Sequence, residues 1–306
     1  MSGPINTGSF AQALWPGVNR WYGDSYKEFP TEWTDLFDQD SSDKAYEELV
    51  GISGFGLAME KSEGSGIQFD SASQTWVTRA INKTYTLGFV LTQELLEDNQ
   101  YRIATLGKRD ARALAFSMRQ TKEIVAANVY NRAFTSGYTF GDGSILCVSS
   151  HPNKVGGTWS NVPTVASDLS EAALEQAFID IGGFTADRGT TINVMPKTLV
   201  VHRSNFFEAV RILKSELQND TANNAVNALR IAGAFPGGVK INHYLTDADA
   251  WFVRTNCPDG MICFNRVAME FDMDNDFSTT NAMYRARERY SFTCGDPRAI
   301  YGSAGG

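Results

Sequence analysis

An alternation of apolar and polar residues over 84–91 is the clearest strand signal in the chain. Apolar side chains occupy every second position, at Tyr85, Leu87, Phe89 and Leu91. A period of two is typical of a strand with one buried face. Further segments of strand-like composition lie at 55–61, 67–70 and 75–82, with a turn-forming Ser-Glu-Gly-Ser-Gly cluster at 62–66. The pattern predicts a long projecting hairpin or meander, which needs another surface to rest on because an isolated hairpin is marginally stable.

Residues 92–136 carry a helical pattern instead. Thr92 can cap the helix, and no proline occurs before Gly137. Apolar or small residues recur every three or four positions, at Ile103, Gly107, Ala111, Leu114, Met118, Thr121, Val125 and Val129. At 1.5 Å per residue this predicts a rod of about 60 Å, longer than a compact domain of this size requires.

The second half of the chain alternates between the two patterns. After a Gly-, Ser- and Asn-rich loop at 137–168, helices are predicted from Ser170 to Phe184 and from Ser204 to Leu217. Residues 226–235 fit either a helix or irregular structure. Strands are predicted at 192–201, 239–245, 250–255 and 284–292. The predicted fold class is therefore α+β.

The first fifty residues form an arm with no sustained period. Its aromatic residues include Phe10, Trp15, Trp21, Tyr22, Tyr26, Phe29, Trp33 and Phe37. Such isolated aromatic side chains need a surface to cover them. That surface is either a neighbouring molecule or the core of the same chain, and periodicity does not distinguish the two.

The arm and its continuation also carry the charge asymmetry of the protein. Eleven acidic residues and three lysines lie between Asp24 and Glu63. Their net charge of 3 − 11 = −8 equals that of all 306 residues, so the rest of the chain is balanced. The predicted long helix presents basic residues, at Arg102, Lys108, Arg109, Arg112, Arg119 and Lys122. A solvated helix face is one interpretation. The other is that arm and helix attract each other through many weak ion pairs, within a chain or between chains.

Composition excludes several classes of protein. A 42% hydrophobic and 12% aromatic content predicts a globular chain with a real core rather than disorder. The acidic pI of about 5.0 argues against a surface built mainly to hold nucleic acid. We identify no signal peptide and no apolar run of membrane-spanning length. The four scattered cysteines, Cys147, Cys257, Cys263 and Cys294, fit buried thiols of an intracellular protein better than disulfides or a zinc site.

No catalytic or metal-binding constellation emerges from the candidate residues. His151, His202 and His243 have no second histidine or carboxylate at ligand spacing. The acidic run at 272–276 resembles the start of a calcium loop, but Phe277 replaces the required glycine and Met283 the required glutamate. It is better explained as an acidic surface loop, with a weak cation site as the alternative.

Phosphate-binding loops and nucleophile elbows are also absent from the sequence. Arg285, Arg287 and Arg289 share one face of a predicted strand, where they can contact nucleic acid or, more commonly, pair with acidic neighbours. We therefore predict no catalytic, cofactor-binding or metal-binding residues, no cofactor and no enzymatic activity.

The order of these segments resembles the major capsid proteins of tailed bacteriophages, which have the Hong Kong 97-type fold. The resemblance covers nearly the whole chain, is shared with Mu-like head proteins, and depends on the order and spacing of short motifs. These are Gly-Phe-Gly at 54–56, Leu-Gly-Phe at 87–89, TQELLEDNQY at 92–101, His151-Pro152, Pro196 to Val201, and 287–292 followed by Asp-Pro-Arg-Ala-Ile-Tyr-Gly.

The resemblance implies five parts. They are an N-terminal arm at 1–51, an extended loop at 52–91 that overlaps a neighbouring subunit, the spine helix of a peripheral domain at 92–136, an axial domain at 137–264, and return strands of the peripheral domain at 265–306. The implied function is that of a structural subunit that self-assembles into the icosahedral head of a tailed phage around double-stranded DNA.

The implied partners are many copies of the chain, arranged as pentamers and hexamers. Portal, scaffolding and decoration proteins and non-specific contact with packaged DNA are also implied, without a membrane. The implied location is the virion, after assembly in the host cytoplasm. The short arm favours a separate scaffold, or none, over an N-terminal scaffolding segment. Two alternatives are an encapsulin-like shell around cargo protein and a metal-dependent enzyme using 272–276.

Some relatives join subunits through isopeptide bonds between lysine and asparagine with help from a glutamate. The residues near the corresponding positions are Asn281 and Glu288, with Lys61 or Lys83 as the amine. A salt bridge is the simpler role for these residues, and denaturing gels of assembled particles distinguish the two.

Overall fold

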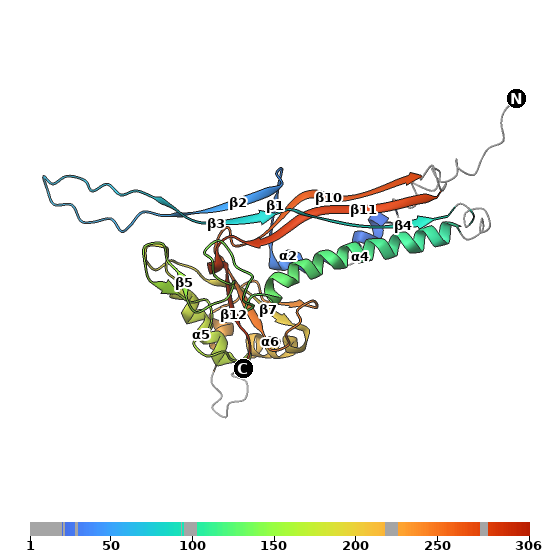
Figure 1. Cartoon of the computed structure of the whole chain (residues 1–306). Coiled ribbons are helices and arrows are strands. Elements are labelled where there is room, and N and C mark those ends of the chain that lie inside the picture. Colours follow the sequence, from blue (N-terminus) through green and yellow to red (C-terminus); the bar gives the residue numbers. More distant parts are fainter. Residues whose placement is uncertain are drawn as a thin grey trace.

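A computed structural model gives the fold and describes residues 20, 22–27, 30–92, 94, 103–217, 226–275 and 281–306. The molecule has two parts, as Figure 1 shows. A long body contains extended strands with one helix lying along them. A compact lobe hangs below one end of that helix and contains the C-terminus.

The body is built on a four-stranded sheet with the order β1-β10-β11-β4. The strands are β1 (Asp38–Ser41), β10 (Met261–Asn275), β11 (Ala282–Cys294) and β4 (Lys83–Leu91). Neighbouring strands are antiparallel except for the parallel pair β1 and β10. In β11 the residues with even numbers from Ala282 to Tyr290 are buried, and those with odd numbers are exposed or half-buried. One face of the sheet is therefore covered, which matches the predicted alternation.

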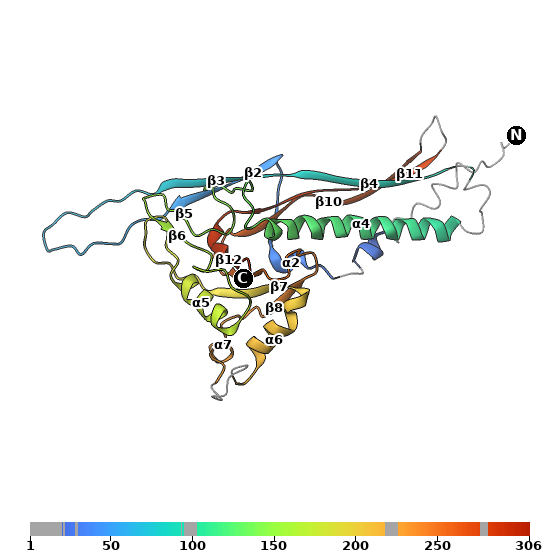
Figure 2. The same cartoon turned by 60° about the horizontal axis from the view of Figure 1, so that its bottom comes forward.

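Helix α4 (Ile103–Asn131) covers that face, as Figure 2 shows. Its 29 residues give a rod of about 43 Å. The predicted start at Thr92 lies next to residues outside the described part. The helix ends five residues before the predicted position 136, because 132–134 form a turn and the side chain of Asn131 bonds Tyr244 and Thr246 of the lobe.

The predicted apolar face of α4 is confirmed at Ala111, Leu114 and Met118, which are buried. Further along, Val125 and Val129 are only half-buried. Their place is taken by Ala126, Ala127 and Tyr130. The buried face of α4 lies on a different side here, because the lobe packs against this part of the helix. The ring of Tyr130 lies edge-on to that of Phe252, with ring centres 5.3 Å apart.

The hairpin consists of β2 (Tyr46–Ser53) and β3 (Ser73–Ile81). No strand forms over 54–72, so the predicted strands at 55–61 and 67–70 are absent from the single chain. The hairpin leads away from the rest of the body (Figure 1). Asn82 joins β3 to β4, which pairs with β11. The segment predicted as one projecting loop, 52–91, is thus divided between a hairpin and the long sheet.

The lobe contains a second sheet with the order β12-β9-β7-β8. Its strands are β12 (Ile300–Ser303), β9 (Trp251–Thr255), β7 (Pro196–His202) and β8 (Val239–Asn242). The helices of the lobe are α5 (Glu171–Gly182), α6 (Phe206–Lys214) and α7 (Ala228–Ile231), with short 3-10 turns at Arg203–Asn205 and Pro297–Ala299. Ser170, where this helix is predicted to start, caps α5 by accepting from the N–H of Ala173.

Strand β12 shows that the end of the chain does not stay with the body. It pairs with β9 in the lobe sheet. The segment 265–306, predicted as one set of return strands, therefore contributes β10 and β11 to the body and its last strand to the lobe. A two-strand piece, β5 (His151–Pro152) with β6 (Thr158–Trp159), links the lobe to the hairpin base.

Three aromatic residues of the arm, Tyr22, Trp33 and Phe37, are covered by the chain itself. Trp33 and Phe37, in and after the short helix α2 (Trp33–Leu36), are buried in the main core. Tyr22 is fully buried and stacks on Phe271 at 4.5 Å. Of the two surfaces left open by the sequence, the same chain's core is the one used here. Phe10, Trp15, Trp21 and Phe29 lie outside the described residues.

Within the described part of one chain, three carboxylates of the arm pair with the lobe rather than with the long helix, and the predicted ionic attraction between arm and helix stays a prediction for neighbouring chains. The carboxylates of Glu32, Asp35 and Asp38 pair with His243, Lys240 and Arg254 of the lobe. Arg119 and Lys122 of α4 point inward rather than to solvent. Arg119 donates to the carbonyl of Tyr26, and Lys122 lies 4.8 Å from the ring centre of Trp33. Arm and helix are joined by hydrogen bonds and a cation–π contact.

We expect the buried carboxylate of Glu123 to stabilise the fold by holding the arm. Its oxygens accept the backbone N–H groups of Glu32 and Trp33 at 3.0 and 2.9 Å. Glu123→Ala leaves both donors without their acceptor and should lower the free energy of unfolding by about 2–3 kcal/mol. Urea unfolding of the unassembled subunit measures this. The control Glu208→Ala removes an exposed pair with Arg211 and should cost about 0.5 kcal/mol or less. Equal losses would contradict this role.

Candidate functional site: an assembly surface

The end of the hairpin exposes large apolar side chains over 52–69. Ile52, Phe55, Leu57, Met59, Ile67 and Phe69 are between 69% and 94% exposed. Scattered apolar residues are normal on a protein surface, but a contiguous set on a projecting segment marks an interaction site. This is the strongest feature of the described surface that calls for a partner.

The hairpin is held at its base by a charged latch. Arg188 donates through Nη1 to the carboxylate of Asp70 at 2.6 Å and through Nη2 to the carbonyl of Ser71. The N–H of Gly56 donates to Asp70 from the other leg. The backbone N–H groups of Gly56 and Ser71 lower the pKa of Asp70, and Arg188 adds to the effect. The latch fixes the two legs to the turn before 190 in the lobe.

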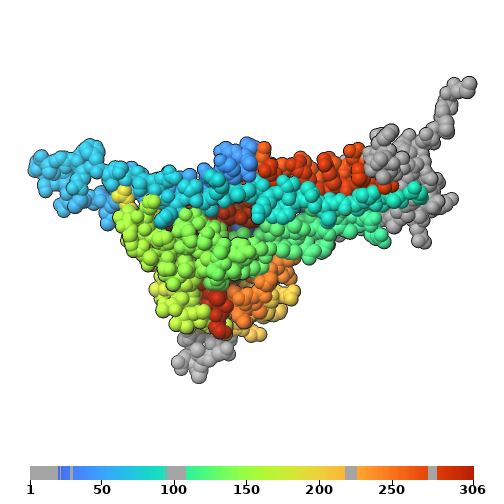
Figure 3. Space-filling view, viewed as in Figure 1, coloured from blue at the N-terminus to red at the C-terminus, as the bar shows by residue number. Residues whose placement is uncertain are grey.

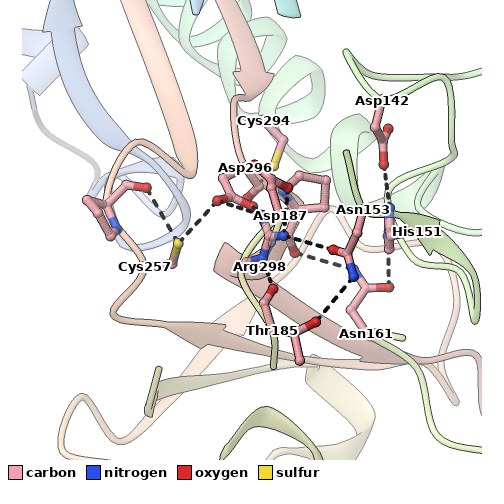
Figure 4. A network of polar contacts seen from close by, with 12 residues as sticks. Asp142, His151, Asn153, Asn161, Thr185, Asp187, Cys257, Cys294, Asp296 and Arg298 are labelled. Atoms are coloured by element: carbon pink, nitrogen blue, oxygen red, sulfur yellow. Dashed lines mark hydrogen bonds and ion pairs between the residues drawn. The ribbon is translucent and has the colours of Figure 1, made fainter. Parts of the chain in front are cut away.

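Below the hairpin base lies a buried polar network centred on His151 (Figure 4). The ring is fully buried, with Nδ1 2.6 Å from Oδ2 of Asp142 and Nε2 3.1 Å from Oδ1 of Asn161. Asn161 is oriented by backbone groups, because its Nδ2 donates to Leu146 and its Oδ1 accepts from Val148. Both ring nitrogens therefore face side-chain oxygens, which hold the ring in one orientation.

Arg298 extends this network to the end of the chain. Its guanidinium pairs with Asp187 at 3.0 Å and Asp296 at 3.3 Å, and lies 4.8 Å from the ring centre of Trp159. Trp159 stacks in turn on His151, with ring centres 4.6 Å apart. A hollow of about 380 Å³ lies between these groups and the hairpin base. The network joins the hairpin base, the loop after α4 and the C-terminal segment.

The structure places the other predicted residues in structural roles. His243 bonds Glu32, and His202 caps the following turn by accepting from Ser204. Arg285 and Arg287 pair with Asp272 and Glu270, so the interpretation of this face as ion pairs is confirmed for these two. Arg289 donates to the carbonyl of Asn82.

The part of the chain that the structure describes contains no disulfide and no cluster of potential metal ligands. All four cysteines are free thiols, and burial raises the pKa of Cys257 to about 12 and of Cys263 to about 12. No group of three or more potential metal ligands occurs among the described residues. Asp276 and Phe277 of the calcium-like segment lie outside them. None of the described helices is long and apolar enough to span a membrane.

The residues considered for isopeptide chemistry are not assembled within one chain. Glu288 is buried and pairs with Lys122 at 3.5 Å, as expected for the simpler salt-bridge role. Asn281 precedes β11, about 23 Å along the strand from Glu288 at 3.3 Å per residue. Lys61 is exposed in the hairpin end, and Lys83 is exposed opposite Tyr290 of β11.

Comparisons with known proteins agree with this arrangement. Residues 77–303 match the family model described as phage capsid protein. Among solved structures, one titled Mycobacterium phage Che8 is similar, with a TM-score of 0.53 and 13% identity over 89% of this chain and 90% of that one. The capsid of the native GTA particle is similar with a TM-score of 0.51 and 12% identity, covering 98% and 91%. The comparison with curated proteins finds no match.

The mixed helix and sheet architecture is therefore that of phage capsid structures. The chain belongs to the phage capsid protein family. It is a subunit of a phage capsid shell, and its place is in the virion. The family match favours this function over the encapsulin-like alternative.

Sequence reasoning missed the network around His151. It rejected this histidine because no ligand lies at metal spacing, whereas the partners Asp142 and Asn161 are nine and ten residues away. A weak signal was present, since Asp142 and His151 both lie in the polar loop between α4 and α5, where a charged residue is normally exposed.

We expect Asp142 to stabilise the subunit in a pH-dependent way. Burial raises its pKa, but the hydrogen bonds from His151 and Ser144 outweigh this and hold the pKa below the ordinary 3.8. A lowered acid pKa stabilises the fold above the ordinary value, and this stabilisation is lost as pH falls. Asp142→Asn should cost about 1–3 kcal/mol at pH 7, and the cost should shrink toward about pH 3.

Urea unfolding of the unassembled subunit at several pH values measures the difference. Asp40→Asn is the control, because Asp40 is exposed and its carboxylate accepts only the neighbouring Ser41 N–H among the described residues. A cost of Asp142→Asn that stays constant between neutral and acid pH would show that the carboxylate charge is not responsible.

Proposed function

We propose that the chain is the major subunit of the icosahedral head of a tailed phage and has the Hong Kong 97-type fold. Copies associate as pentamers and hexamers into a closed shell around double-stranded DNA. The observation that carries this proposal is the hairpin, which projects beyond the body and exposes six large apolar side chains. A segment of this kind buries its apolar surface only when another molecule covers it.

The elements of the structure support a role for each part. The hairpin β2–β3 with 54–72 acts as the extended loop, α4 as the spine helix of the peripheral domain, and the lobe as the axial domain that meets its copies around the symmetry axes. The residues before β1 act as the N-terminal arm. On this assignment β4 belongs with the peripheral domain rather than with the extended loop.

The available energy supports stable association. Full burial of one large apolar side chain contributes about 1.5–3 kcal/mol. Each hairpin supplies six such side chains, and a closed shell holds each subunit through several neighbours. The summed free energy of burial therefore outweighs the entropy lost on association more readily than a single contact does.

The remaining partners follow from the same proposal. The shell assembles in the host cytoplasm with portal, scaffolding and possible decoration proteins, and contacts packaged DNA without sequence readout. The net charge of −8 supports weak, non-specific contact rather than tight binding to phosphates. We also propose that the subunit has no enzymatic activity and needs no cofactor, since the described ionisable clusters are engaged in structural pairs.

Replacing the exposed apolar residues should separate folding from assembly. In the triple variant Leu57→Ser, Met59→Ser and Phe69→Ser, all three positions are at least 72% exposed, so the free subunit should unfold within about 0.5 kcal/mol of the wild type. The shell should fail to form, because the buried intersubunit area is lost. Electron microscopy and sedimentation of the purified protein measure assembly, and urea unfolding measures stability.

A matched control replaces apolar residues that are exposed elsewhere. Val155→Ser and Val165→Ser are 68% and 75% exposed on loops of the lobe. This variant should assemble like the wild type. Normal shells from the hairpin variant would contradict the proposal, as would a wild-type protein that remains monomeric at high concentration.

A further inference from the structure

A lysine, an asparagine and a glutamate from three different elements meet beneath α4. Lys122 of α4 donates through Nζ to Oδ1 of Asn265 in β10 at 3.2 Å. The same nitrogen lies 3.5 Å from Oε2 of Glu288 in β11. An amine, a carboxamide and a carboxyl group therefore share one small space. A structural ion pair needs only the first and the last of these groups.

The space is closed off from solvent. The side chains of Lys122 and Glu288 are only 12% and 1% exposed, and Asn265 is half-buried. The rings of Trp33 and Tyr290 cover the amine, with Nζ 4.8 Å from each ring centre. Figure 3 shows α4 lying directly against β4 on one face of the molecule, so helix and sheet together cover the space between them. Water is largely kept from the three groups.

The carboxyl group of Glu288 has hydrogen-bonding capacity to spare. Its Oε1 is buried and has no hydrogen-bond partner among the described residues. A buried oxygen of this kind is costly, above all when it carries charge. Transfer of one proton from the Lys122 ammonium to the carboxylate removes both buried charges. The product is a neutral amine, the nucleophilic form of a desolvated lysine.

Asn265 is placed to be the group that this amine attacks. Its Oδ1 accepts from Lys122 and also lies 3.9 Å from Sγ of Cys263, so donors polarise the carbonyl. Strand β10 is distorted here, because its register with β11 shifts between Asn265 and Val267 and again between Val267 and Glu270. Such bulges re-aim side chains and are frequent beside active sites.

We propose that Lys122 and Asn265 join through an isopeptide bond within one chain, with Glu288 as the proton relay. The lysine and the asparagine differ from those considered above for joining subunits, and the bond ties α4 to β10 rather than one copy to another. Because the three groups are already in contact, no co-reactant has to be brought to them.

The reaction balances without an oxidant or a metal. The lone pair of Nζ adds to Cγ of Asn265, the carbonyl electron pair moves to Oδ1, and Oδ1 takes the proton held by Glu288. The carboxylate then removes a proton from Nζ and passes it to Nδ2. The C–Nδ2 bond breaks, the carbonyl forms again, and the hydroxyl proton returns to Glu288. One ammonia leaves, and the carbon keeps its oxidation state.

The bond gives the long body a covalent tie. Lys122 and Asn265 are 143 residues apart in the sequence, so the bond closes a long loop and restricts the unfolded chain, as a disulfide does. It is a single self-modification without turnover, which is compatible with a subunit that has no enzymatic activity. It also needs only one chain, so it holds or fails separately from the proposed assembly.

Mass spectrometry of the denatured wild-type subunit tests the bond. The chain should be lighter than its sequence by one ammonia. Trypsin does not cut after an acylated lysine, so residues 120–132 and 255–266 should appear as one branched peptide joined at Lys122 and Asn265. Wild-type protein with the full sequence mass and separate peptides would overturn the proposal. Covalent multimers joined through these two residues would overturn a bond within one chain.

Three variants test the roles of the residues. Lys122→Arg and Asn265→Ala should each abolish the loss of ammonia. Glu288→Gln keeps the size of the side chain but removes the relay, so the loss should become about 100-fold slower or undetectable. The control Glu208→Gln changes an exposed carboxylate paired with Arg211 and should react like the wild type. Wild-type ammonia loss in folded Glu288→Gln would overturn the relay. If that variant does not fold, the wild-type mass and peptides still decide whether the bond exists.

Discussion

The packing of α4 along one face of the long sheet is the contact on which the remaining structure depends. Its central link is Lys122, which pairs with the buried Glu288 of β11 and lies 4.8 Å from the ring centres of both Trp33 and Tyr290. One side chain thus joins the helix, the sheet and the arm. A charge buried in this way is costly unless it is paired, so these elements hold one relative position.

At the C-terminal end of the helix, Tyr130 performs the same task for the lobe. Its hydroxyl donates to the carbonyl of Leu36, and its ring packs edge-on against Phe37 and Phe252. The lobe is therefore fixed to the body by the arm as well as by the chain connection. The rigid frame that results leaves only the hairpin extending away from the common core.

The sequence revealed elements where burial follows a simple period. β4, β11 and α5 were found because alternation or a serine cap is written locally in the chain. The inward position of the ionic residues of α4 could not be predicted, since Arg119 and Glu123 are buried only because the arm returns across the helix. Partners ninety or more residues apart carry no local signal.

One part of the candidate site could be predicted from the sequence and the other could not. The exposed apolar hairpin could be predicted, because alternating large residues flank a glycine-rich turn. The network of Asp142, His151 and Arg298 could not, because it is assembled from a loop, a two-residue strand and the C-terminal segment. The prediction of strands in the hairpin legs failed for a single chain because a strand requires a neighbour as well as a suitable sequence.

A hairpin that projects away from the body of its own subunit has a consequence for the geometry of assembly. When the hairpin of one subunit is covered by a different patch of the next subunit, the contact is head-to-tail, so the growing array keeps one unfilled patch of each kind at its two ends. Such growth stops only when rotation returns the last subunit to the first, and otherwise continues as an open filament. The angle fixed between hairpin and lobe by Arg188 and Asp70 thus helps to decide between a closed ring and endless polymerisation.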